Sequence, residues 1–254
     1  MFDTSDTESL VTRVNPSVKL ILHLFCMFFL IFAGDWKTTL YLSLIPIAIT
    51  LLVARISLKK FLIGTSPFLI SFLATTWMFA AYGKGQTVWW EWGWIRITAE
   101  GLDTGLEVGF RMLGFVAYGF LFVSTTDITH LMLSLMQQCK VPPKIGYAML
   151  AGFRFLPMFK EEYEQIKAAH RVRGVGRMPG VRGKVQAFLR YTIPLLAQGI
   201  RKAERVAVAL EARGFDGAAE RTFYRQMTVG RTDAVYLVML IGLNVGLLWL
   251  CWRG

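Results

Sequence analysis

The chain has 254 residues, of which 54% are hydrophobic, and its mean hydropathy is +0.46. This is too apolar for an ordinary soluble domain, so the composition predicts a membrane protein with several helical spans. A formal net charge of +11 would also suit a nucleic-acid-binding protein. Membrane topology accounts for the placement of that charge, however, and we expect no nucleic acid as a partner.

Five apolar runs are candidates for these spans. A helix needs roughly 20 residues to cross a bilayer, with tolerance for about 17–25. The third and fifth runs are long enough, whereas the first two are short unless flanking residues are included. The runs are residues 20–33, 40–54, 61–81, 106–123 and 234–251. We therefore expect an all-α, polytopic membrane protein with about five spans.

The excess positive charge lies in residues 126–231, which hold 18 Lys and Arg against 8 Asp and Glu. Basic residues next to spans mark the cytoplasmic side. The loop 55–60, with three basic residues, indicates the same side, whereas 84–103, with two basic and three acidic residues, is expected outside. We expect four spans in residues 1–125, a cytoplasmic helical segment at 126–231 and a last span in 232–254, with the N-terminus in the cytoplasm.

Several residues near the span ends have structural interpretations. Asn15 is predicted to cap the first span, which Pro16 would begin, and the Lys19 side chain is expected to extend to the membrane interface. The external loop carries tryptophans at positions 89, 90, 92 and 94. We interpret this group as an interfacial anchor, and an external lid over a substrate path is the alternative.

Arg111 is a charged residue inside the fourth apolar run. Such a charge is costly in lipid and usually faces protein. Glu107 lies one helical turn earlier, at the spacing of an ion pair. We expect a structural pair that orients the helix, and a residue of a transport path is the alternative.

Two helix-patterned stretches in the basic segment end in the same way, at Val172-Arg173-Gly174 and at Ala212-Arg213-Gly214. Pro157 is predicted to open the first helix and Pro194 the second. An arginine in a last turn followed by glycine is favoured by the helix dipole and by capping alone. Its duplication favours a docking role, because a guanidinium suits a carboxylate in the groove of a partner protein.

The same helices carry apolar stripes. In the first helix the stripe includes Ile166 and Ala169, and in the second it includes Leu196, Ile200, Ala203, Ala207 and Leu210. Gly199, Ala203 and Ala207 follow at intervals of four, a spacing of small residues that lets helices approach closely. The sequence therefore predicts a pair of helices, each with an apolar face and a charged end.

These residues resemble the transmembrane T component (EcfT/CbiQ-like) of energy-coupling factor (ECF) transporters, which are ABC-type importers of vitamins and metal ions. The resemblance covers nearly the whole chain. It rests on the arginine motifs within residues 157–174 and 194–215, on Asn15-Pro16-Ser17-Val18-Lys19-Leu20, on Arg111-Met112 and on Thr125-Thr126. The chain departs from the family at Val172, where a small residue such as alanine is more usual, and this should change packing at that helix end more than a salt bridge.

The resemblance implies a mechanism with three partners. Two ABC ATPase subunits, as a homodimer or heterodimer, would receive Val172, Arg173, Gly174, Ala212, Arg213 and Gly214, with each arginine meeting an acidic residue. A substrate-binding S component would contact Ile166, Ala169, Ile200, Ala203, Ala207 and Leu210. Closure of the ATPase dimer would move these coupling helices and tip the S component in the lipid bilayer. The location implied is the cell membrane of a bacterium or archaeon.

We expect the chain itself to be non-catalytic. Gly180-Val181-Arg182-Gly183-Lys184-Val185 differs in spacing from a phosphate-binding loop and lacks its hydroxyl, so ATP and Mg would be used by the partner subunits and no cofactor is expected here. The histidines and acids lack the clustering that a membrane enzyme would need. The three cysteines form no Cys-x-x-Cys pair, so neither a metal site nor a disulfide framework is expected.

The transported substrate is chosen by another subunit in this family. An importer of thiamine or its hydroxymethylpyrimidine precursor is our hypothesis, and a cobalt or nickel importer is the alternative. A stand-alone secondary transporter is an alternative of another class. Such transporters usually carry inverted repeats or interrupted spans, and we find no such symmetry in the sequence.

Overall fold

The computed structural model describes residues 9–83, 85, 87–92, 95–174, 180–217 and 222–253, and describes the backbone alone for residues 90–92, 95, 96 and 252. Its elements are α1 (Pro16–Ile31), α2 (Trp36–Ala48), the π-helical turn η2 (Ile49–Val53), α3 (Leu58–Tyr82), β1 (Val88–Trp92), β2 (Ile95–Thr98), α4 (Ala99–Thr125), α5 (Ile128–Gln138), α6 (Pro143–Val172), α7 (Gly180–Ala212) and α8 (Arg231–Arg253). Within the described residues, four helical stretches are long and apolar enough to cross a membrane, and α1 is a shorter apolar helix. The expected helical, polytopic membrane fold is confirmed.

The chain divides into two compact units. Unit 1 comprises Met1–Ser134 and Met227–Gly254, and unit 2 comprises Leu135–Gln226. Helix α5 begins in unit 1 and ends in unit 2. The compact unit 2 thus starts later and ends earlier than the segment 126–231 that charge alone delimits.

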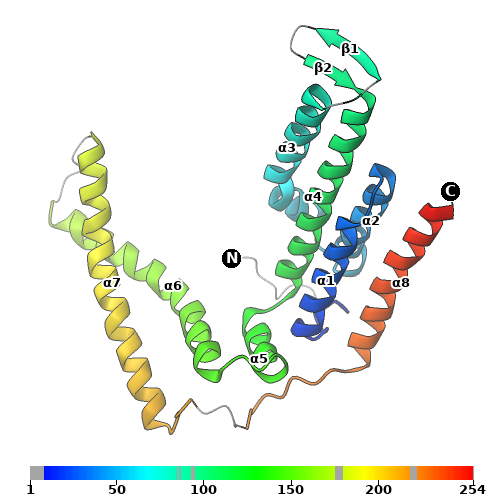
Figure 1. Cartoon of the computed structure of the whole chain (residues 1–254). Coiled ribbons are helices and arrows are strands. Elements are labelled where there is room, and N and C mark those ends of the chain that lie inside the picture. The colour runs from blue at the N-terminus through cyan, green and yellow to red at the C-terminus, as the bar shows by residue number, and fades with distance from the viewer. Residues whose placement is uncertain are drawn as a thin grey trace. The chain divides into compact units, whose positions relative to one another are not determined.

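Helix α4 packs against α1, α2 and α3 in unit 1 (Figure 1). Its close approach to α3 depends on glycines spaced four residues apart. A β-carbon at Gly105 would lie 2.9 Å from the main-chain oxygen of Thr76, and one at Gly109 would lie 2.7 Å from the Phe72 ring. The backbones of α3 and α4 therefore lie too close for a larger residue. The same spacing of small residues was predicted to matter only in the 199–207 stretch, and its role in α4 was not predicted.

The interior of unit 1 is an apolar cluster that contains a few hydrogen-bonded polar side chains. Buried members include Leu22, Leu30, Leu42, Tyr118, Leu121 and Leu240. Nε2 of His23 lies 2.7 Å from the Tyr236 hydroxyl, which ties α1 to α8. The other ring nitrogen of His23, Nδ1, is buried without a hydrogen-bond partner among the described residues, so the rule that buried polar atoms need partners is met at one nitrogen of this ring and not at the other.

The start of α1 confirms one prediction and contradicts another. The side-chain oxygen of Asn15 accepts a hydrogen bond from the Ser17 amide at 3.2 Å, so Asn15 is the predicted cap, and α1 begins at Pro16. Lys19 does not extend to an interface, because its side chain is completely buried. Its Nζ instead donates to the main-chain oxygen of Thr125 at 3.1 Å. The free carbonyls at the end of α4 provide the polar partners that burial of the ammonium requires.

The tryptophan-rich loop forms an antiparallel hairpin of β1 and β2 between α3 and α4. Trp89 is 72% exposed. Trp94 and the side chains of Trp90 and Trp92 lie outside what the structure describes, so the interfacial anchor and the lid both stay predictions.

Helices α6 and α7 of unit 2 start earlier than predicted. Pro157 lies inside α6, which begins at Pro143, and Pro194 lies inside α7, which begins at Gly180. The prediction that these prolines open the helices was therefore wrong. A proline removes one main-chain donor and crowds the preceding turn, but a long helix with other contacts continues through it.

Candidate partner-binding site

Helix α6 ends in the way that its sequence predicts. Arg173 is the C-cap residue, and the amide of Gly174 donates to the main-chain oxygen of Arg171 at 3.1 Å. Gly174 has a φ of +66°, a left-handed conformation that glycine adopts without strain. Val172 is 89% exposed, and Arg173 and Gly174 are exposed as well. The three residues therefore form an accessible helix end with a hydrogen-bonded cap.

Helix α7 ends in a complete Schellman motif. The amide of Gly214, with φ +76°, donates to the Glu211 oxygen at 2.9 Å, and the amide of Phe215 donates to the Leu210 oxygen at 2.9 Å. The Phe215 ring packs edge-on against Tyr147 near the start of α6, with ring centroids 5.4 Å apart. Ala212, Arg213 and Gly214 are exposed. The second arginine thus occupies the same C-cap position as the first, on an end fixed by hydrogen bonds.

Helices α6 and α7 contact each other within unit 2 through three kinds of interaction. Glu162 and Lys202 form an ion pair whose two side chains are largely buried, at 14% and 18% exposure. The Phe159 ring covers Gly199, where a β-carbon would lie 3.2 Å away. The Tyr191 ring of α7 lies 5.6 Å from the ring of Tyr163. The predicted pair of helices is present, and Gly199 serves the close contact that its spacing suggests.

Most of the remaining stripe residues are exposed in the chain alone. Ala169, Ala203 and Ala207 are exposed, and Ile200 is 53% exposed. Ile166 and Leu210 are half-buried. The stripe on α7 therefore presents small and branched apolar side chains to the surroundings of the chain, an arrangement that suits packing against another helix.

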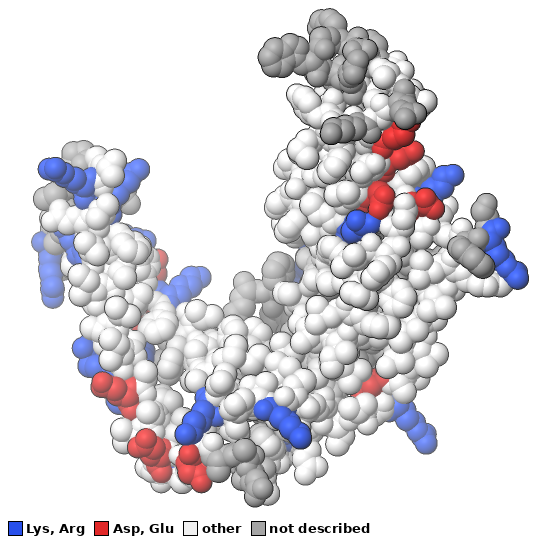
Figure 2. All heavy atoms as spheres, viewed as in Figure 1, with Lys and Arg blue, Asp and Glu red and all other residues white. Residues whose placement is uncertain are grey.

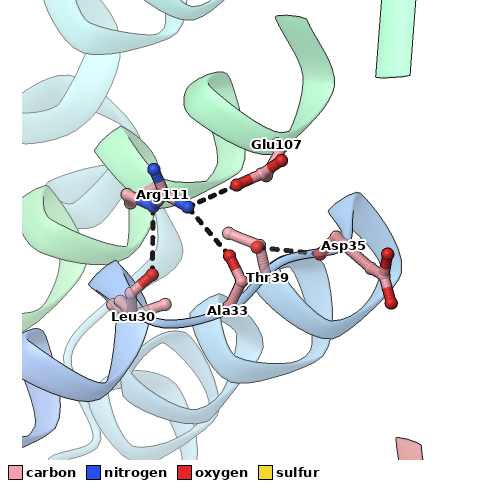
Figure 3. Close-up of polar contacts among 6 residues, drawn as sticks. All are labelled: Leu30, Ala33, Asp35, Thr39, Glu107 and Arg111. Carbon is pink, nitrogen blue, oxygen red and sulfur yellow. Dashed lines mark hydrogen bonds and ion pairs between the residues drawn. The ribbon is translucent and has the colours of Figure 1, made fainter. Parts of the chain in front are cut away.

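Arg111 and Glu107 form the predicted ion pair in α4, and Arg111 makes two further contacts that were not predicted (Figure 3). Its Nε donates to the main-chain oxygen of Leu30 at 3.0 Å, and its Nη2 donates to that of Ala33 at 2.9 Å. Both oxygens belong to the last turn of α1 and the residues after it. Arg111 thus provides the end of α1 with donors and with a positive charge that complements the helix dipole.

A cavity of about 880 Å³ opens beside this ion pair. Asp35, Glu100, Asp103 and Glu107 line it together with Lys37, so its charge is mainly negative. Figure 2 shows Asp and Glu side chains gathered on this part of unit 1, near the hairpin. Among the described residues, no three His, Cys, Asp or Glu side chains are grouped so that they could hold a metal ion.

The chain is similar to membrane proteins of one transporter class. Residues 7–224 match the family model CbiQ, which is described as cobalt transport protein. The energy-coupling factor transporter transmembrane protein EcfT of Limosilactobacillus fermentum is 29% identical over 247 residues, covering 94% of this chain and 92% of the relative. The EcfT of Streptococcus thermophilus is 27% identical, covering 96% and 95%, and that of Staphylococcus aureus is 27% identical, covering 97% and 95%.

Proposed function

Because the chain belongs to the CbiQ family and is a T component of an ECF transporter, we propose that it couples ATP hydrolysis by two partner subunits to movement of a substrate-binding membrane subunit. The observation that carries this proposal is the pair of arginines, Arg173 and Arg213, at equivalent C-cap positions. Both are exposed, and both follow long helices that pack against each other. Neither helix end needs an arginine there for its own hydrogen bonds, which the backbone makes.

In this proposal the two helix ends dock into two ABC ATPase subunits. Val172, Arg173 and Gly174 enter one subunit, and Ala212, Arg213 and Gly214 enter the other. A guanidinium offers five donors in a rigid fork, so each arginine is suited to bind a carboxylate in a bidentate manner. The capped backbones support this role, because a helix end whose backbone is already hydrogen-bonded loses little backbone entropy on binding, and only the arginine side chain then has to be ordered.

The apolar stripes on the same helices would contact the S component. Ile166 and Ala169 contribute from α6, and Ile200, Ala203, Ala207 and Leu210 contribute from α7. Small side chains allow close approach of a second helix inside a membrane or at its surface. The partial exposure of this stripe in the chain alone supports its use by a partner.

The proposed orientation places the N-terminus, α6 and α7 in the cytoplasm of a bacterial or archaeal cell. The excess of Lys and Arg in residues 126–231 supports this orientation. ATP and Mg would bind only to the ATPase subunits, and this chain would be non-catalytic.

For the substrate, we propose thiamine or its hydroxymethylpyrimidine precursor, recognised by the S component. The description of the matching family model as cobalt transport protein favours the cobalt or nickel importer as the second candidate. The experiment is to tag the chain in its native host, purify the intact complex and identify the copurifying subunits by mass spectrometry. Reconstituted complex is then tested for ATP-dependent uptake of labelled thiamine, cobalt and nickel.

Two ATPase subunits and a small membrane subunit in the complex, with uptake that requires ATP, would support the proposal. Gradient-driven uptake by the chain alone would overturn it in favour of a stand-alone secondary transporter.

A further inference from the structure

A buried polar cluster at the start of α1 joins the two places where the chain connects unit 1 with unit 2. Ser134 is the last residue before unit 2, and Thr228 follows shortly after it. The side chain of Asn15 reaches both. Its Oδ1 accepts from the Ser134 hydroxyl at 2.6 Å, and its Nδ2 donates to the main-chain oxygen of Thr228 at 3.5 Å. The Asn15 side chain therefore bridges the segment that leads into unit 2 and the segment that returns from it.

Ser17 strengthens the outgoing side of this bridge. Its hydroxyl lies 2.6 Å from the Ser134 hydroxyl, and because that hydroxyl donates to Asn15, Ser17 is the donor in this pair. Ser134 and Ser17 are 0% and 1% exposed. The Ser17 amide also donates to the Ser134 hydroxyl, at 3.3 Å, so three buried hydrogen bonds hold the end of the outgoing chain.

Asp233 holds the returning side. Its Oδ1 accepts from the Asn15 amide at 2.6 Å, and its Oδ2 accepts from the Gly230 amide at 2.7 Å, just before α8 begins. A carboxylate in the first turn of a helix that binds the preceding amide is also favoured by the helix dipole. The same carboxylate therefore caps α8 and fixes the start of α1 to it.

Lys19 completes the cluster one turn into α1. Its Nζ donates to the main-chain oxygen of Thr125 at 3.1 Å, to the Thr125 hydroxyl at 3.2 Å and to the Thr126 hydroxyl at 3.4 Å. The ammonium thus uses all three of its donors on the end of α4, directly before α5. A buried cation with this set of partners is costly to displace, because each freed group would lose its partner away from water.

We propose that the start of α1 is a clamp that keeps the outgoing and returning ends of unit 2 joined throughout the transport cycle, and that Asn15 and Lys19 are positioning residues for energy coupling. This proposal rests on the coupling role proposed above for α6 and α7. In that role, the two chain connections are the covalent path by which force at the ends of these helices reaches α4 and α8. A joined pair of connections transmits that force to both helices together, whereas separate connections would transmit it to each helix independently.

The first test is a set of variants in the complete transporter, reconstituted with its ATPase and S subunits. Asn15→Ala, Ser134→Ala and Lys19→Met each remove part of the clamp. Thr50→Val is the matched control, because the Thr50 hydroxyl is also fully buried but donates only to Pro46 within its own helical stretch. The measured quantity is uptake per ATP hydrolysed, with whichever of labelled thiamine, cobalt or nickel the wild-type complex transports.

We expect the clamp variants to lower uptake per ATP by about tenfold, in the range of typical coupling effects, while the ATPase subunits still copurify. Thr50→Val should retain the wild-type ratio. A merely structural role would lower protein yield and melting temperature without changing that ratio, and this outcome would overturn the proposal.

The second test is a disulfide between Ser17→Cys and Ser134→Cys, whose native hydroxyl oxygens already lie 2.6 Å apart. Cys139→Ser and Cys251→Ser remove the two native thiols that are not buried, and the single-cysteine variants are the controls. A clamp that stays closed predicts equal uptake by the oxidised and reduced transporter. Uptake that is lost on oxidation and restored by reductant would show that the joint opens, and would overturn the proposal.

Failure of the clamp proposal can be distinguished from failure of the proposed function. If no ATPase subunits copurify with the wild-type chain, the coupling role itself fails. If they copurify and the clamp variants transport with the wild-type ratio, only the clamp fails.

Discussion

The guanidinium of Arg111 in α4 donates a hydrogen bond to the main-chain oxygen of Leu30 at 3.0 Å, and so fastens α4 to the last turn of α1. Arg111→Met would leave this oxygen, the Ala33 oxygen and the Glu107 carboxylate without their donor. We expect a loss of about 2 kcal/mol or more in the free energy of unfolding, because a partly buried acceptor without a donor is costly. The measurement is the thermal unfolding of the purified complex in detergent.

Glu107→Gln is the matched variant for Arg111. It removes the charge of the pair but leaves both main-chain contacts of the guanidinium, so its effect on stability should be smaller. If Arg111→Met kept the wild-type melting temperature but abolished uptake, a transport-path role would replace the structural one.

Arg173 and Arg213, at the two helix ends, should act together in binding the ATPase subunits. We expect the double variant Arg173→Glu, Arg213→Glu to insert in the membrane but to lose the ATPase subunits on affinity purification. Each single variant should lose them in part, since a truncated interfacial charge pair costs about 2–5 kcal/mol. Arg201→Glu, Arg205→Glu is the control, with the same change of charge on exposed positions of α7. Copurification of ATPase subunits with the double variant Arg173→Glu, Arg213→Glu at wild-type yield would contradict the docking role.

The close contact of α3 and α4 predicts that two glycines of α4 respond differently to replacement by alanine. Gly105→Ala places a β-carbon 2.9 Å from the Thr76 oxygen and should destabilise unit 1 by about 1–3 kcal/mol. Gly119 has no atom within 4 Å of such a β-carbon, so Gly119→Ala should be neutral or stabilise by up to about 1 kcal/mol. Melting temperatures of the two variants, measured side by side, decide this. Equal shifts would mean that the helices do not approach as described.

The ion pair of Glu162 and Lys202 predicts a rescue by charge exchange. Lys202→Glu places two carboxylates at the contact of α6 and α7 and should loosen it, and Glu162→Lys should do the same with two ammonium groups. The double exchange restores opposite charges in a largely buried position, where the pair matters more than on a surface. Hydrogen exchange of the α6 and α7 amides reports the loosening. A double variant as loose as either single one would speak against the pairing.

The sequence predicted those features that depend on local chemistry. Asn15 as a cap, the pair of Glu107 and Arg111, and glycines at 174 and 214 each follow from neighbours within one turn, and the structure contains all of them. The helix bounds around Pro157 and Pro194 were wrong, since contacts along long helices outweigh the local penalty of a proline. A single sequence holds no direct signal for such contacts.

Polar contacts between residues far apart in the chain could not be predicted from the sequence either. Lys19 appeared suited to an interface, but it is buried because the end of α4, more than 100 residues later, supplies its acceptors. The bonds from Arg111 to the end of α1 were missed for the same reason. The lone polar residues in apolar surroundings were the available signal, because a buried charge must find a partner somewhere in the fold.

The ring contact between Tyr147 and Phe215 helps to set the distance between Arg173 and Arg213. It holds the Arg213 end of α7 near the beginning of α6, whereas Arg173 marks the far end of that same helix. With a rise of 1.5 Å per residue, the 147–173 stretch separates the two arginines by about 40 Å. In the proposed docking, the length of α6 therefore sets the distance between the two grooves that would receive Arg173 and Arg213.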